Sequence, residues 1–519
     1  MKSFLQRFAS LVLGVLVGFD RWRFRGSKRM LCYPDGVMSF LSHHSILLKE
    51  FNKPYAKEMT DRLCAAIEKP ATEAGIYRFL NSSKISKEET ALALAKEHGK
   101  TEGLIAVLGC TEPCQNLRVR GNRQTKKLEM RVESGKCLHY YHYYLDAEFG
   151  LRYTRLQSWF PFTMHMGLNG RDWLAQQMTK AGIDFVKKDN CFTWIRDFEA
   201  AQQLMNQQQE TAWQPLLDGW ARQSFPLGAT LLESEIPYYW SIQEGEYATD
   251  IAFRKAEDLA RLYPTWVQHA YSTLHSRDLL RYMNYRVRAD GRPLALGEVK
   301  TTIKELAEGI CVRHHVLRNL LKMYDKQQSV LRVESSLLDL EHFKVFRAKE
   351  GDEDGPKSYR RLRKGVADMH RRAEVSEKIN DRYVASLASV EEKRTLAEVT
   401  KDISQRVQWQ GRTCRALNPL APADASLLAA VGRGEFMIDG FSNRQIRALL
   451  FTDAESADAA TQKRQSGKVT RWLRLLRAHG LIAKVPKTHR YQVTEKGRAN
   501  ISVILAAREA NTKLLLQAA

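Results

Sequence analysis

Residues 310–338 read ICVRHHVLRNLLKMYDKQQSVLRVESSLL, and this stretch carries the clearest fold signal of the chain. It holds three runs rich in apolar and β-branched side chains, at 310–316, 320–326 and 330–338, separated by the short turn-like segments LRN and QQS. Strands joined by such short connections pair antiparallel. The stretch therefore predicts a three-stranded antiparallel meander.

The rest of the central chain extends this pattern. Helical apolar spacing dominates 36–96 and 172–225, whereas short β-rich runs recur between and after these segments. The predicted strands are 104–108, 127–132, 137–145, 152–160, 164–168, 238–243, 247–253 and 298–303. Strands and helices in separate blocks predict an α+β fold, with a mostly antiparallel sheet and helical layers.

Chain length and changes in pattern predict four regions. A chain of 519 residues is long enough for two to four domains, each with its own core. We expect an N-terminal helical region packed on the body at 1–100. Its apolar run 11–19 is too short to cross a bilayer and predicts a helix packed on the body. A central α+β body then covers 101–345, a helical linker region 346–425, and a winged-helix domain 426–519.

The last region shows helical signals followed by a basic hairpin. Ser442 and Gln445 have capping-box spacing before one amphipathic helix. A polar loop at 453–467 then precedes a second helix, and strands are predicted at 481–485 and 490–494. The buried stripe of the second helix is formed by Val469, Trp472, Leu473 and Leu476. This order, followed by Thr494-Glu-Lys-Gly-Arg, resembles the winged helices of the MarR type, and the resemblance implies a DNA-binding module.

Positive charge is concentrated in this region. Between Thr461 and Arg498 the chain has eleven Lys or Arg residues and one acid, Glu495. A helix bound in a DNA groove, with a wing on the phosphates, needs this balance. The candidate nucleic-acid contacts are Lys468, Arg471, Arg474, Arg477, Lys487, His489 and Arg490. A protein-docking surface with a solvated basic face is the alternative.

The whole chain is also basic, with a formal net charge of +22 from 81 Lys and Arg against 59 Asp and Glu. Such a charge favours nucleic acid, DNA first and RNA second, over an anionic membrane surface. In the aromatic run 139–144 and its neighbouring strand, Arg152 and Arg155 are candidates for phosphate contact beside stacked bases. A purely structural sheet explains the same residues.

The eight cysteines are dispersed, which is typical of a reduced cytoplasmic protein. Cys110 and Cys114 are close in sequence, but a zinc site would need a second cysteine pair or histidines at ligand spacing.

One candidate catalytic centre lies in the meander. The string Lys-Met-Tyr-Asp-Lys, followed by Leu-Arg-Val-Glu, resembles strands of the replication initiators of rolling-circle plasmids and filamentous phages. By that resemblance Tyr324 is a DNA-nicking nucleophile, Glu334 a metal ligand, and His314 or His315 a second ligand or base. The adjacent histidines depart from the family pattern, because neighbours on a strand point to opposite faces. An ion-paired structural face is the alternative.

A second candidate centre is built from carboxylates. Asp146 and Glu148 follow one predicted strand, and Glu246 and Asp250 lie in or beside another. Nucleases hold Mg²⁺ or Mn²⁺ with carboxylates from different strands. Acids in a hairpin loop, present for turn reasons alone, are the alternative for Asp146 and Glu148.

Taken together, these patterns predict a cytoplasmic nucleic-acid-binding protein of a bacterial mobile element or plasmid-like system, anchored to DNA by its winged helix. A Mg²⁺- or Mn²⁺-dependent nickase, nuclease or replication initiator is the first alternative, and a transcriptional regulator with a large sensing body is the second.

Overall fold

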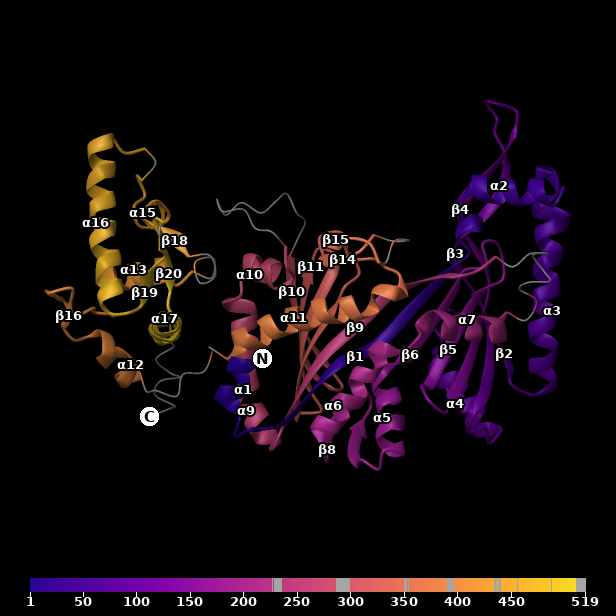
Figure 1. Cartoon of the computed structure of the whole chain (residues 1–519), viewed down its shortest axis with the longest axis horizontal. Helices are drawn as coiled ribbons and strands as arrows, with labels where there is room; N and C mark the ends of the chain where they lie inside the picture. Colours follow the sequence, from indigo (N-terminus) through magenta and orange to yellow (C-terminus); the bar gives the residue numbers. More distant parts are fainter. Residues whose placement is uncertain are drawn as a thin grey trace. The chain divides into compact units, whose positions relative to one another are not determined.

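Helices and a large, mostly antiparallel sheet give the chain the α+β fold that the sequence predicts. The structure is a computed structural model that describes residues 1–225, 236–285, 299–349, 354–388, 396–433, 440–454, 456–486 and 488–509, with a few single residues between these ranges (Figure 1). The chain divides into two compact units. The first contains Met1–Val12, Phe253–Leu317 and Ile379–Ala519, and the second contains Leu13–Ala252 and Arg318–Lys378.

The second unit is built on a sheet with the strand order β12-β13-β9-β1-β6-β5-β4-β3-β2. The pairs β12-β13, β13-β9, β1-β6, β6-β5, β5-β4 and β4-β3 are antiparallel, whereas β2 runs parallel to β3. The strands are β1 (Val12–Ser27), β2 (Tyr77–Leu80), β3 (Gly103–Gly121), β4 (Leu128–Asp146), β5 (Gly150–Gln157), β6 (Met164–Asn169), β9 (Tyr239–Phe253), β12 (Asn319–Lys326) and β13 (Val330–Ser336).

The predicted meander is confirmed as three strands. Its first strand is β11 (Gly309–Val316), which pairs with β10 (Val299–Leu306) in the first unit. β12 and β13 are its other two strands and pair with each other in the second unit. Two further predicted strands, 238–243 and 247–253, form the single strand β9.

The prediction of an N-terminal helix over the apolar run 11–19 is wrong. Only α1 (Lys2–Phe8) is helical, and β1 crosses the middle of the second unit's sheet. The β-branched side chains of Val12, Val15 and Val17 favour a strand here. In addition, a Cβ at Gly14 would lie 2.2 Å from the Phe198 ring, and one at Gly18 would lie 2.4 Å from Met205. The glycines therefore let the helix that carries Phe198 and Met205 pack directly on the strand.

Helices flank this sheet in the segments where helical spacing is seen. Ser86 caps the predicted helix at 87 by accepting a hydrogen bond from the Glu89 amide at 3.3 Å. In Figure 1, α5 and α6 lie beside the part of the sheet formed by β1 and β6. The helices are α2 (Pro34–His43), α3 (Lys57–Glu73), α4 (Lys87–Glu97), α5 (Gly170–Lys180), α6 (Phe198–Gln207), α7 (Trp213–Ser224) and the start of α11 (Met369–Leu387). Two small hairpins complete the unit, β7 (Phe185–Lys188) with β8 (Cys191–Ile195) and β14 (Lys344–Arg347) with β15 (Ser358–Arg361).

In the first unit, β10 and β11 are accompanied by the helices α9 (Ala256–Ser272) and α10 (Ser276–Tyr282). Phe4 and Phe8 of α1 pack on Trp266 of α9, with ring centroids 5.5 and 5.7 Å from the indole. Tyr263 of α9 donates a hydrogen bond to the carbonyl of Ile310 at 2.7 Å. These contacts tie α1 and α9 to the β10-β11 pair.

The C-terminal module, defined as residues 396–509, has its own hydrophobic core. It opens with α12 (Leu396–Ile403) and the hairpin of β16 (Val407–Trp409) and β17 (Arg412–Cys414). Then come α13 (Pro422–Val431), β18 (Phe441–Ser442), α15 (Asn443–Leu450), α16 (Ala459–Ala478), β19 (Ile482–Lys484), β20 (Arg490–Val493) and α17 (Glu495–Glu509). A three-stranded sheet has the order β18-β20-β19.

The helix ends of this module follow from its sequence. The predicted capping box is present, because the Ser442 hydroxyl and the Gln445 side chain each bond to the other residue's backbone amide. The predicted loop 453–467 is too long: α16 begins at Ala459, where Asp458 accepts a hydrogen bond from the Thr461 amide at 2.6 Å. Within the described residues, no helix combines the length and the apolar character needed to cross a membrane.

Candidate functional site

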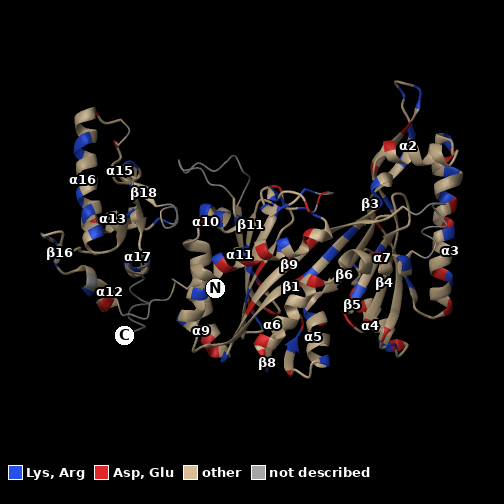
Figure 2. Cartoon of the chain, in the orientation of Figure 1, with Lys and Arg blue, Asp and Glu red and all other residues tan. Residues whose placement is uncertain are grey.

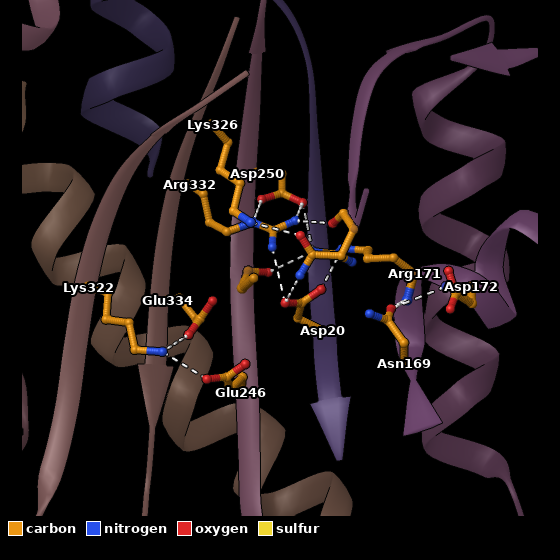
Figure 3. Close-up of polar contacts among 12 residues, drawn as sticks. Asp20, Asn169, Arg171, Asp172, Glu246, Asp250, Lys322, Lys326, Arg332 and Glu334 are labelled. Carbon is orange, nitrogen blue, oxygen red and sulfur yellow. Dashed lines mark hydrogen bonds and ion pairs between the residues drawn. The ribbon is translucent and has the colours of Figure 1, made fainter. Parts of the chain in front are cut away.

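A cluster of buried charges lies where β1, β9 and β13 meet α5 (Figure 3). Arg332 of β13 is directly opposite Asp250 of β9, and its side chain has no exposed surface. Its Nε and Nη2 donate to the two carboxylate oxygens of Asp250 at 2.5 and 2.8 Å, and its Nη1 donates to Asp20 Oδ2 at 3.1 Å. The guanidinium thus joins three adjacent strands through charge-assisted hydrogen bonds.

α5 supplies a second buried guanidinium to the same cluster. Asn169 caps the helix by accepting from the Arg171 amide at 2.7 Å, and a Cβ at Gly170 would meet the Phe19 carbonyl at 2.1 Å. The helix can therefore begin directly against β1. From its first turn, Arg171 Nη2 pairs with Asp250 at 2.9 Å, while its Nε lies 4.0 Å from Asp20 Oδ1. The charges of two arginines, Arg332 and Arg171, therefore compensate those of two carboxylates, Asp20 and Asp250, in the protein interior.

Next to these pairs, Lys322 of β12 holds two glutamates. Its Nζ lies 2.6 Å from Glu334 and 2.8 Å from Glu246. Burial and the Glu246 charge raise the pKa of Glu334 to about 7. Burial would lower the pKa of Lys322, but Glu334 and Glu246 outweigh it and raise that pKa. The lysine therefore stays charged and is the counter-ion of the pair.

The cluster contains a set of carboxylates that could hold a metal ion. Asp20, Glu246 and Glu334 each offer one oxygen, and these three oxygens lie within 4.8 Å of one another. They come from β1, β9 and β13, which are neighbours in the sheet. Asp20 Oδ1 is buried and accepts no hydrogen bond from any described residue. Hard oxygen ligands of this kind fit Mg²⁺ or Mn²⁺, although Lys322 already neutralises part of their charge.

The structure brings three of the sequence-predicted catalytic residues together. Tyr324 is directly opposite Arg332 in the β12-β13 pair, so it adjoins Asp250 across β13 and follows Lys322 by two positions. Glu334 lies on the same strand as Arg332. Tyr324 is nearly buried, and the Lys326 ammonium lies 5.4 Å from the centroid of its ring.

Asp146 and Glu148 do not join this cluster, because β1, β6 and β5 separate β4 from β9 in the sheet. Asp146 Oδ1 accepts from the amides of Glu148 and Phe149 at 3.0 and 3.1 Å, as expected of a turn residue. Its Oδ2 accepts from Arg152 at 2.9 Å. The carboxylate site predicted from Asp146, Glu148 and Asp250 is therefore not formed as one site.

The histidine suggested as a metal ligand or base already has two partners. His314 is buried, with Nδ1 2.8 Å from the Thr301 hydroxyl and Nε2 2.9 Å from the Tyr383 hydroxyl. Burial lowers its pKa to about 4, so the ring is neutral at neutral pH. His314 is thus a hydrogen-bonded core histidine.

The two arginines predicted to meet phosphate differ in their surroundings. Arg152 is buried: its guanidinium pairs with Asp146 and lies 4.0 and 4.4 Å from the ring centroids of Tyr144 and Trp220. A surface role for Arg152 is therefore wrong. Arg155 is half-buried and donates to Glu112 at 2.8 Å.

Arg155 belongs to a row of basic side chains across the sheet. Arg25 of β1 is opposite His165 of β6, which is opposite Arg155 of β5. Arg21, Arg23 and Arg25 occupy every second position of β1 and so share one face. Arg21 and Arg25 are exposed, and Arg23 pairs with Glu244 at 3.2 Å. Figure 2 shows these positions as blue bands along β1.

In the C-terminal module, the predicted basic contacts lie on or after α16, whose blue bands are visible in Figure 2. Lys468 and Arg471 are exposed, with the Lys468 ammonium 4.9 Å from the ring centroid of Trp472. Arg474 and Arg477 instead pack over Trp409 of β16, at 5.8 and 4.9 Å from its ring centroid. These two keep only part of their surface for a ligand.

The remaining predicted contacts belong to the hairpin of β19 and β20. His489 is exposed, and Arg490 donates to the Gly440 carbonyl at 3.1 Å. Lys487 lies outside the described residues.

Sequence reasoning missed Asp20 and Arg171 as members of the cluster. Asp20 had a detectable signal, because it follows the apolar run Val15-Leu-Val-Gly-Phe19 and precedes Trp22 by two positions, and an acid buried there must be paired. The sequence has no comparable signal for Arg171, because the position of its side chain depends on how α5 packs against the sheet. Comparison of the chain with family models, curated proteins and solved structures gives no match.

Proposed function

We propose that the chain is a DNA-binding protein and that residues 422–509, from the start of α13, act as a winged helix. The observation that carries this proposal is the two-sided character of α16. Val469, Leu473 and Leu476 are buried in the core of the module, whereas Lys463, Arg464, Lys468 and Arg471 are exposed. A helix of this kind can lie in the major groove with its cations on the phosphates.

The hairpin after α16 supports the same proposal. β19 and β20 pair beside α16, with the exposed residues Lys484 and His489 near the turn between them. The order of α13, β18, α15, α16, β19 and β20 matches a winged helix, in which the second and third strands carry the wing. The DNA contact proposed here consists of the exposed face of α16 and this hairpin.

The test is a salt titration of binding. Full-length protein is added to a labelled DNA duplex at several salt concentrations, with an RNA duplex of equal length as competitor. We expect Arg471→Ala to weaken binding and to lower the slope of log affinity against log salt by roughly 1. Lys401→Ala, which removes an exposed charge from α12 of the same module, should leave both unchanged. Equal effects of the two variants, or binding without salt dependence, would contradict the proposal.

A second candidate function, divalent-metal-dependent cleavage of DNA, is supported by the buried cluster. Asp20, Glu246 and Glu334 converge on one point, and Tyr324 lies on the adjoining strand. Arg21 of β1 is near the cluster: partial burial lowers its pKa, but the charges of Glu246, Asp20 and Glu334 outweigh this and raise it. In this function the three carboxylates would hold a metal ion that polarises the scissile phosphate. The Tyr324 oxygen would bond to phosphorus while one P–O bond to a deoxyribose breaks, so that one DNA end stays on the tyrosine and the other leaves with a free hydroxyl.

Conversion of supercoiled plasmid to the nicked form in Mn²⁺ tests this function. We expect Tyr324→Phe and Glu334→Gln to abolish nicking, and the wild-type protein to form a covalent adduct with the DNA end. Asp146→Asn, which changes a turn residue outside the cluster, is the matched control and should retain activity. If Tyr324→Phe nicks at the wild-type rate, the tyrosine has no role in the reaction.

A further inference from the structure

Three potential metal ligands lie together on β3 and β4, away from the buried cluster. Cys114 and Cys137 have their Sγ atoms 3.2 Å apart, and both are half-buried. His139 follows Cys137 by two positions on the same strand and face, and both of its ring nitrogens lie 4.0 Å from Cys137 Sγ. One ligand atom from each of the three residues lies within 4.8 Å of the others.

The ladder between β3 and β4 argues against a simple disulfide here. Cys114 is directly opposite Gly135, and Cys137 is opposite Glu112, so the two cysteines are diagonal neighbours. Diagonal Cα atoms in an antiparallel pair are about 7–8 Å apart, whereas disulfides need about 4.4–6.8 Å. A metal ion can bridge cysteines whose Cα atoms are this far apart. With two bonds of about 2.3 Å to sulfur, it places the two sulfurs roughly 3.8 Å apart.

His139 is oriented for coordination by its own backbone contact. Its Nδ1 lies 3.1 Å from the Cys137 carbonyl oxygen, which can only accept, so Nδ1 carries the proton in this contact. Nε2 is then the unprotonated nitrogen that can bind a metal ion, and it lies 4.0 Å from Cys137 Sγ. Metal-ligating histidines commonly have this arrangement, in which the second ring nitrogen donates to a carbonyl.

Polar side chains surround the three potential ligands. Asn116 Nδ2 lies 3.9 Å from Cys114 Sγ, and a Cβ at Gly135 would come within 2.8 Å of that same nitrogen. Because residue 135 is a glycine, the Asn116 side chain has space at this position. Glu112 is occupied by Tyr141 and Arg155 and is therefore not counted among the ligands.

From this geometry we infer that Cys114, Cys137 and His139 bind a thiophilic divalent ion of the Zn²⁺ class. Two thiolates and one neutral imidazole form a neutral site with Zn²⁺, in the ligand set that this ion prefers. The site is independent of the DNA contact and of the carboxylate cluster. An ion there would clamp β3 to β4 in the middle of their long hairpin.

Cobalt substitution tests the site in the full-length, reduced protein. Co²⁺ titration should give sulfur-to-metal charge-transfer absorption and the visible bands of a tetrahedral ion, saturating at one equivalent and bleached by Zn²⁺. Cys114→Ser and Cys137→Ser should each lose the charge-transfer band or most of it, and His139→Gln should shift the visible bands. Cys64→Ser, which changes a half-buried cysteine on α3, should titrate as the wild type does.

Two results would overturn the inference. One is a wild-type titration without a charge-transfer band, and the other is an unchanged band in the double variant Cys114→Ser/Cys137→Ser. Near-wild-type circular dichroism of the double variant establishes that it is folded, so that its loss of the band reports the ligands themselves.

Discussion

Arg332 shows how single residues hold the centre of the second unit. Its guanidinium is completely buried between Asp250 and Asp20, and Arg171 shares both carboxylates. Removing one partner from such a group leaves a buried charge without compensation.

We therefore expect Arg332→Leu to lower the free energy of unfolding by about 3–5 kcal/mol. Urea unfolding followed by circular dichroism measures this change. Arg196→Ala provides the comparison, because the Arg196–Asp184 pair is exposed and should contribute less than about 1 kcal/mol. Similar unfolding midpoints for the two variants would mean that the buried cluster does not stabilise the fold.

Glu334 gives the cluster a pH dependence. Its pKa in the folded protein is about 7 against an ordinary value of 4.5, because of burial and the Glu246 charge. Between these values the folded state binds more protons at this site than the unfolded state does. This residue's contribution to stability is thus fully present below 4.5 and falls as pH rises towards 7.

Glu334→Gln removes this titration. In metal-free buffer, the melting temperature of the variant relative to the wild type should therefore rise as pH increases through that window. A difference in melting temperature that is constant with pH would show that Glu334 titrates normally.

At the scale of elements, local sequence signals explain where several helices begin. Ser442 and Gln445 mark the start of α15, and Ser86 marks that of α4. β1 is the exception, since its apolar run has no clear period and its strand form depends on the close packing of α6 on Gly14 and Gly18. Such an element is decided by its neighbours rather than by its own propensity.

The cap of α15 gives a prediction at this scale. Ser442→Ala removes the hydroxyl that accepts from the Gln445 amide and should destabilise the C-terminal module by about 1 kcal/mol. Hydrogen exchange of the α15 amides measures the effect. Ser404→Ala, an exposed serine after α12, should leave exchange unchanged. If the α15 amides are equally protected from exchange in both variants, the capping box does not contribute to stability.

At the scale of the whole molecule, charge is spread beyond the C-terminal module. Residues 461–498 account for +10 of the net +22, as eleven bases less one acid, so +12 lies elsewhere. Part of it is the exposed face of β1 with Arg21 and Arg25. If both regions meet nucleic acid, neutralising one should leave salt-dependent binding by the other.

A variant with alanine at Lys463, Arg464, Lys468 and Arg471 tests this division. We expect it to bind DNA more weakly but to keep a measurable salt slope, which falls further when Arg21 and Arg25 are also replaced by alanine. Fluorescence anisotropy across a salt series measures both slopes. If the first four substitutions alone remove all salt dependence, binding is confined to the C-terminal module.

The sequence by itself determined the α+β class, the meander strands, the α15 cap and the cationic face of α16, because periodicity, capping and charge act within a few residues. It also identified Tyr324, Glu334 and Asp250 as candidates by residue type. Only the tertiary structure decided that these three meet Asp20 and Arg171, that Asp146 pairs with Arg152, and that Cys114 lies beside Cys137 rather than Cys110. Such pairings depend on strand order and register, which are set by contacts between segments far apart in the chain.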